Sequence, residues 1–122
     1  MQHLLGEYSI VVKMDVSDLK ASSDWYQNKL DLMPEPQFNS PDWRQFIFTD
    51  MPNVSIGLHE NPEKSGSGGD AFTIVVKDID SARMQLLSKG VDISEDTEVG
   101  CGVILAYFDD PDGNHLVIRQ QH

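Results

Sequence analysis

The sequence contains a single cysteine, Cys101, and no long run of apolar residues. One thiol cannot close an internal disulfide, which favours folding in a reducing compartment, and we expect the cytoplasm. Residues 1–7 lack the basic start and the apolar core of a signal peptide, and no segment approaches the roughly 20 apolar residues that cross a bilayer. The sequence therefore predicts neither export nor a membrane span.

Basic side chains are also scarce, because 9 Lys and Arg stand against 20 Asp and Glu, for a net charge of −11. Such a surface repels phosphate backbones and anionic lipids, so we expect no nucleic acid and no membrane as partner. It would attract a cationic molecule, although acidity of this kind more often serves solubility alone. The 122 residues, of which 39% are hydrophobic, suffice for one domain, 1–122, with a modest core.

The first half of the chain alternates strand and helix patterns. Residues 10–16 predict a strand, because apolar residues recur at every second position. A helix should follow, capped by Ser17 or Asp18, with a buried face made of Leu19, Ser22, Ser23, Tyr26 and Leu30. Three further strands are expected at 33–38, where Pro34 and Pro36 interrupt the pattern, and at 43–49 and 54–60, with a turn at 50–53.

The second half repeats this order after a linker at 61–70, whose Gly, Ser and Pro content predicts flexibility. Within the linker, Gly66-Ser67-Gly68-Gly69 lacks the Lys and Ser/Thr of a phosphate loop. We expect a strand at 72–76, a helix at 79–88 that stops at Gly90, and strands at 91–95, 102–108 and 114–119.

The two halves also match in sequence, since Val16-Ser17-Asp18-Leu19 aligns with Val76-Lys77-Asp78-Ile79. Together with the repeated order of elements, this match predicts an α+β fold of two tandem βαβββ modules, at about 8–60 and 71–120. The sequence predicts that a turn joins the last two strands. Pro111 fixes φ at its first corner, Gly113 supplies a positive φ, and Asp110 and Asp112 can bond the local backbone.

Two segments carry a resemblance to a known family. Residues 16–32 are similar to the first-helix signature of the vicinal oxygen chelate superfamily, V-x-D-L-x-x-S-x-x-[FW]-Y with an L-G-L-like end, and Asp31 stands where the glycine usually does. Residues 108–114 resemble its closing hairpin. The superfamily includes glyoxalase I, extradiol dioxygenases, fosfomycin-resistance enzymes and bleomycin-resistance proteins. The resemblance implies curved half-barrel sheets around a cavity, and a homodimer.

In the superfamily's enzymes, four strand positions carry metal ligands, typically His, Gln or Glu. The resemblance puts these positions at Val11, Gly57, Ala71 and Val117. None of these residues offers a side chain that binds a divalent cation, and a shift by one residue does not supply one. We therefore predict no metal at these positions and no cofactor, and we assign no catalytic residue.

Strand alternation predicts that the faces opposite the core are partly polar, because successive side chains point to opposite sides. Trp43 and Tyr107 could stack on a planar or cationic molecule, and Trp43 could equally fill the interior. His59 and His115 could form a displaced metal site with Asp15, or serve as acid or base. The predicted ligand-binding residues are Lys13, Asp15, Trp43, Gln45, His59, Thr73, Tyr107, His115 and Arg119.

These residues favour a metal-free small-molecule-binding protein that resembles the bleomycin-resistance proteins and holds a planar or cationic organic ligand. Two alternatives stay open. One is a metal-dependent lyase or oxidoreductase of the glyoxalase or dioxygenase type, with relocated ligands. The other is a non-catalytic interaction domain. Metal content separates the enzyme from the other two, and stabilisation by a ligand separates the binding protein from the interaction domain.

Overall fold

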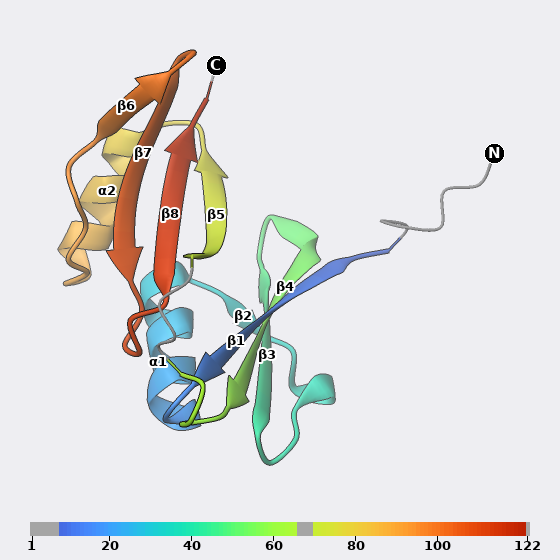
Figure 1. The fold of residues 1–122 in the computed structure, drawn as a ribbon. Coiled ribbons are helices and arrows are strands. Elements are labelled where there is room, and N and C mark those ends of the chain that lie inside the picture. Colours follow the sequence, from blue (N-terminus) through green and yellow to red (C-terminus); the bar gives the residue numbers. More distant parts are fainter. Residues whose placement is uncertain (1–7, 66–69, 122) are drawn as a thin grey trace. The chain divides into compact units, whose positions relative to one another are not determined.

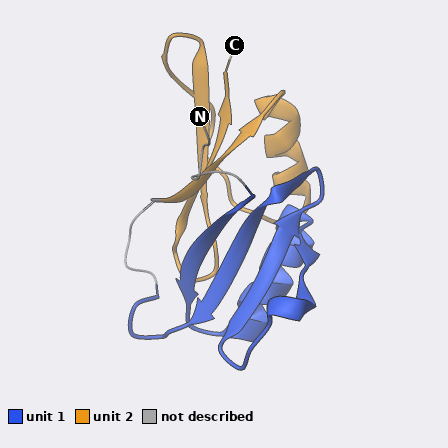
Figure 2. Cartoon of the chain, turned by 90° about the vertical axis from the view of Figure 1, so that its right-hand side faces the viewer, with its two compact units in different colours: residues 1–65 blue, residues 66–122 orange. Residues whose placement is uncertain are grey.

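A computed structural model describes residues 8–65 and 70–121 of the chain. The chain divides into two compact units, residues 1–65 and residues 66–122 (Figure 2). Each unit consists of one four-stranded sheet with one helix along one of its faces (Figure 1). Among the described residues, no helix is long and apolar enough to cross a membrane.

Unit 1 has the element order strand, helix, strand, strand, strand. Its sheet has the order β1-β4-β3-β2, in which β1 runs parallel to β4 and the other pairs are antiparallel. The elements are β1 (Ile10–Val16), α1 (Leu19–Leu30), β2 (Met33–Pro34), the 3₁₀ helix η1 (Pro36–Phe38), β3 (Trp43–Phe48) and β4 (Met51–Glu60).

Unit 2 repeats this topology. Its sheet has the order β5-β8-β7-β6, again with one parallel pair, β5 and β8. The elements are β5 (Asp70–Val76), α2 (Ile79–Ser88), β6 (Thr97–Gly100), β7 (Val103–Asp109) and β8 (His115–Gln120). The predicted α+β fold of two βαβββ modules is confirmed. Of the expected linker, Gly66-Ser67-Gly68-Gly69 lies outside the described residues, and Asp70 already belongs to β5.

Both helices begin at the aspartates that the two halves share in sequence. The Asp18 carboxylate caps α1 by accepting from the backbone N–H of Ala21, and Asp78 caps α2 by accepting from the N–H groups of Asp80 and Ser81. Gly90, with φ of 81°, follows the end of α2 as predicted. These caps satisfy backbone donors that a helix start would otherwise leave without partners.

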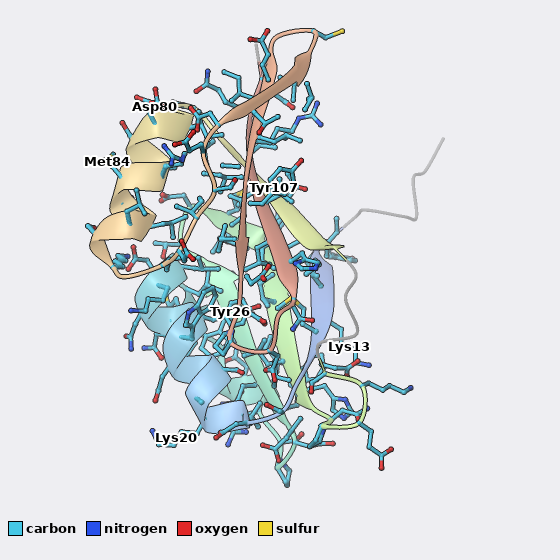
Figure 3. The ribbon with its side chains drawn as sticks, turned by 60° about the vertical axis from the view of Figure 1, so that its left-hand side comes forward. Lys13, Lys20, Tyr26, Asp80, Met84 and Tyr107 are labelled. Carbon is cyan, nitrogen blue, oxygen red and sulfur yellow. The ribbon has the colours of Figure 1, made fainter. Side chains whose placement is uncertain are left out.

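The core of unit 1 lies between its sheet and α1. Met14 of β1 is buried beneath α1, where the Tyr26 hydroxyl approaches its sulfur at 3.6 Å. Tyr26 and Lys13 lie on opposite sides of β1 (Figure 3). Ile10, the first of the alternating apolar residues of this strand, is 60% exposed and adds little to this core.

The expected turn at 50–53 is wrong, because β4 already begins at Met51, which pairs with Phe48 across the reversal. The pattern misled because Pro52 usually indicates a break. Here its missing N–H removes no bond to β1, since β1 pairs with β4 only from Val54 onward.

The expected strand at 91–95 is also wrong, because the fourth strand of unit 2 is β6 at Thr97–Gly100. Val91 follows α2 and closes its C-terminal end, because its N–H donates to the carbonyl of Leu86. Ile93 makes only an isolated bridge to Phe108. Val91 and Ile93 are nevertheless buried, so the apolar pattern reflects core packing and not a strand.

The turn between β7 and β8 forms as predicted around Asp110. Its buried carboxylate accepts from the backbone N–H groups of Asp112 and Asn114 and from the Asn114 amide. Gly113 adopts a φ of 80°, which residues with a side chain rarely reach.

Candidate functional site

The face of the unit 1 sheet that points away from α1 is partly polar, and its register is fixed by strand pairing. Lys13 and Gln45 both lie opposite Gly57, in the parallel and antiparallel ladders respectively. One step along the sheet, Asp15 and Trp43 both lie opposite His59. The sequence-predicted residues of this unit therefore share one surface. We call it the polar face of unit 1, made of Lys13, Asp15, Glu35, Asp42, Trp43, Gln45, Ser55, Gly57 and His59.

Trp43 lies flat enough on this face to cover Gly57. A Cβ atom built on Gly57 would be 2.0 Å from Cζ2 of the indole, so only glycine leaves room for the ring. The indole N–H donates to Oε1 of Gln45 at 3.1 Å. Trp43 is half-buried, so the strand register, the glycine and the amide together hold an aromatic ring that remains partly exposed.

Glu35 extends this hydrogen-bonded chain. The Gln45 amide, having accepted from Trp43, donates through Nε2 to Oε1 of Glu35 at 3.2 Å. The Ser55 hydroxyl donates to the same oxygen at 2.9 Å. Hydrogen bonds in series polarise one another, so the negative charge of Glu35 orients the amide and, through it, the indole.

His59 connects two carboxylates at the other end of the face. Its Nδ1 lies 3.2 Å from Asp15 Oδ1 and its Nε2 lies 3.1 Å from Asp42 Oδ2. Ionised carboxylates only accept, so both contacts are hydrogen bonds at once only when both ring nitrogens carry protons. Lys13 adds an ion pair to Asp15 at 3.3 Å.

These contacts shift the pKa values of both carboxyl groups. Partial burial would raise the pKa of Asp15, but hydrogen bonds from His59 and Lys13 outweigh it and lower that pKa below the ordinary value. The pKa of Asp42 is lowered chiefly by the hydrogen bond from the Ser40 hydroxyl and then by that from His59. Both groups therefore stay ionised in mildly acidic solution.

The sequence-predicted residues of unit 2 share the face away from α2. Thr73 and Tyr107 both pair with Val117 in the β8 ladders, so they lie on the same face of the sheet. Tyr107 is 44% exposed. At the two ends of this face, His115 Nδ1 lies 2.6 Å from Asp109 Oδ1, and Arg119 donates to the Gln121 side chain.

The residues at the superfamily's metal positions do not fit a divalent metal. In unit 1, Val11 is an exposed aliphatic residue, and the space above Gly57 contains the Trp43 ring. In unit 2, Ala71 and Val117 offer no donor atom. Within the described ranges, no group of three or more His, Cys, Asp or Glu side chains is arranged to hold a metal ion.

Sequence reasoning missed Glu35 and Asp42 as members of the polar face. Glu35 lies between two prolines, which restrict the backbone on both sides. A charged residue held in this way could have been recognised from the sequence as a candidate site residue. Asp42 directly precedes Trp43 in a turn, and only the strand register shows that it meets His59.

Two tandem βαβββ units are the architecture of the vicinal oxygen chelate class that the first-helix signature indicated. The family model described as the Glyoxalase/Bleomycin resistance protein/Dioxygenase superfamily matches residues 9–118, and the chain belongs to this superfamily. No curated protein matches the chain significantly.

Several solved structures share the fold. TnmS3, an antibiotic binding protein from Streptomyces sp. CB03234, is similar with a TM-score of 0.82 and 20% identity, over 98% of this chain and 100% of its own. A superfamily member from Sphaerobacter thermophilus DSM 20745 has a TM-score of 0.75 and 21% identity, over 97% of this chain and 100% of its own. An integron cassette protein from the mobile metagenome of Halifax Harbour Sewage Outfall has a TM-score of 0.79 and 22% identity, over 93% and 98%.

Proposed function

We propose that this chain is a small-molecule-binding protein that holds a planar or cationic organic ligand against the polar face of unit 1, without a divalent metal. The observation that carries the proposal is the Trp43 indole, which lies over Gly57, one of the four positions where related enzymes carry a metal ligand. A partly exposed ring held by a hydrogen bond is a stacking surface prepared before the ligand arrives.

The charge of the chain and the superfamily support the same proposal. A net charge of −11 attracts a cationic ligand, and an indole face attracts cations within about 6 Å of its centre. Antibiotic binding by TnmS3, a protein of the same fold, supports a ligand of comparable organic character. A metal-dependent lyase or dioxygenase with relocated ligands has less support, since both ring nitrogens of His59 are already engaged by carboxylates.

Trp43 fluorescence tests this proposal. The chain has two tryptophans, so Trp25→Phe leaves Trp43 as the sole indole, and Trp43→Phe is the matched control that reports from α1. The ligand panel consists of planar organic cations and neutral aromatics. We expect some of these compounds to give a saturable change in fluorescence in the Trp25→Phe variant and none in the Trp43→Phe variant. The same compounds should raise the melting temperature of the wild type. If no compound does so at millimolar concentration, the proposal is wrong and the interaction-domain alternative is favoured.

The expected homodimer and the expected cytoplasmic location form part of this proposal. Sedimentation at micromolar concentration tests the dimer, for which a mass twice that of the chain is expected. Fractionation of the source cells tests the location. A monomer, or recovery outside the cytoplasm, would contradict the respective expectation.

A further inference from the structure

Glu35 differs from the other two carboxylates of the polar face in its partners. Asp15 is paired with Lys13 and His59, and Asp42 is paired with His59. Within residues 8–65 and 70–121, no Lys, Arg or His side chain pairs with Glu35, which is only half-exposed. A carboxylate in such a position lacks the counter-ion that partial desolvation normally requires.

The protein nevertheless fixes Glu35 firmly. Its backbone N–H donates to the Gln45 carbonyl at 2.9 Å, and its carbonyl accepts from the N–H of Phe38 at 3.1 Å. Pro34 and Pro36 restrict the chain on both sides. On the side chain, Oε1 accepts from both Gln45 and Ser55, while Oε2 has no hydrogen-bond partner among the described residues. One oxygen is therefore held in place, and the other is available to a donor from outside the chain.

The position of Glu35 relative to the indole indicates which kind of ligand group would donate to its carboxylate. Glu35 is joined to the Trp43 N–H through a single amide, that of Gln45, so one side chain separates the carboxylate from the ring on this face. A planar cation stacked on the indole would direct its charged or N–H-bearing edge toward a negative group that the protein leaves without a counter-ion.

We propose that Glu35 is the residue that makes this site selective for cationic ligands, by accepting from the positive group of a molecule stacked on Trp43. This inference rests on the proposed function. It assigns stacking, which any planar molecule can use, to Trp43, and charge discrimination to Glu35. Gln45 and Ser55 are positioning residues that hold the carboxylate in register with the ring.

Glu35→Gln tests the assignment with little risk to the fold, because the amide oxygen can still accept from Gln45 and Ser55. The variant is made in the Trp25→Phe background and titrated with two probes at neutral pH, the permanent cation N-methylquinolinium and a neutral methylquinoline of the same size. Asp24→Asn is the matched control. It removes the same charge from α1, on the other side of the sheet, where Asp24 forms an exposed ion pair with Lys20 one helical turn away.

We expect Glu35→Gln to weaken binding of the cation about fivefold, the size of a partly exposed charge contact, and to leave the neutral probe unchanged. Asp24→Asn should change neither. Equal effects of Glu35→Gln on both probes, or an equal loss of cation binding in Asp24→Asn, would overturn the role of Glu35 while leaving the proposed function intact. If neither probe nor any compound of the panel binds the parent protein, the proposed function itself fails.

Glu35→Asp tests whether the position of the carboxylate matters in addition to its charge. The shorter side chain keeps the charge but withdraws it from Gln45 and Ser55, so selectivity for the cation should fall partway and the neutral probe should again bind as before. Full selectivity in this variant would show that charge alone, without the fixed position, is sufficient, and would overturn the positioning roles of Gln45 and Ser55.

Discussion

The indole of Trp43 fills the space into which a side chain on Gly57 would project, with Cζ2 only 2.0 Å from the site of a Cβ. Gly57 is the second of the four positions that the superfamily's enzymes use for metal ligands. A ligand residue at position 57 and the observed place of the Trp43 ring exclude one another. The glycine at position 57 is therefore consistent with the proposal that the chain binds its ligand on Trp43 without a metal.

The first prediction follows from this contact. Gly57→Ala should lower the free energy of unfolding by about 1–3 kcal/mol, because the methyl group overpacks against a ring fixed by Gln45. In a Trp43→Ala background the same substitution should be neutral or stabilising by up to about 1 kcal/mol, because alanine suits a strand better than glycine. Urea unfolding of the four proteins measures the coupling. An equal cost of Gly57→Ala in both backgrounds would show that the ring does not lie there.

The second prediction concerns the turn between β7 and β8. Asp110→Ala should lower the free energy of unfolding by about 2–3 kcal/mol, because the N–H groups of Asp112 and Asn114 lose a buried acceptor. Asp110→Asn keeps one acceptor oxygen and should cost clearly less. The check is again urea unfolding, and the account of this turn fails if the two variants are equally stable.

The third prediction is a pH dependence that comes from Asp15. The folded state lowers the pKa of Asp15, so this group adds stability above its unfolded pKa, and that stability is lost as the pH falls through the folded pKa. Asp15→Asn should therefore be less stable than the wild type at about pH 6, with a difference that shrinks toward about pH 3.

Thermal unfolding of both proteins across this range checks the pH dependence. Asp24→Asn is the control, because the Asp24 carboxylate is exposed and pairs with Lys20, a neighbouring side chain on α1. A difference between wild type and Asp15→Asn that stays constant with pH would contradict the lowered pKa.

Much of the fold could be predicted from sequence because its signals are local. Asp18, one of the two expected caps of the first helix, the helix stop Gly90 and the turn residue Gly113 act within one turn of chain, and each lies where expected. The segment at 91–95 was misread because burial alone gives Val91 and Ile93 the same apolar pattern as a strand. Periodicity reports which side chains are buried, and backbone pairing has to be learned from the structure.

The site could be predicted only in part. Alternation placed Lys13, Gln45 and His59 on one face, because side-chain direction depends on position within a strand. Glu35 could not be assigned this way, since it lies outside the regular strands and reaches Ser55 across the neighbouring strand. Contacts of this kind depend on the register between strands, which the sequence does not state.

The measurement that tests the central claim most directly is the metal content of protein purified without chelator, followed by melting curves with added Ni²⁺, Zn²⁺, Mn²⁺ and Fe²⁺. We expect far less than one ion per chain and no rise in melting temperature, because Val11, Gly57, Ala71 and Val117 offer no side-chain ligand atoms. A stoichiometric ion, or a clear rise with one of these metals that Asp15→Asn or His59→Gln abolishes, would contradict metal-free binding. It would also favour the enzyme with relocated ligands.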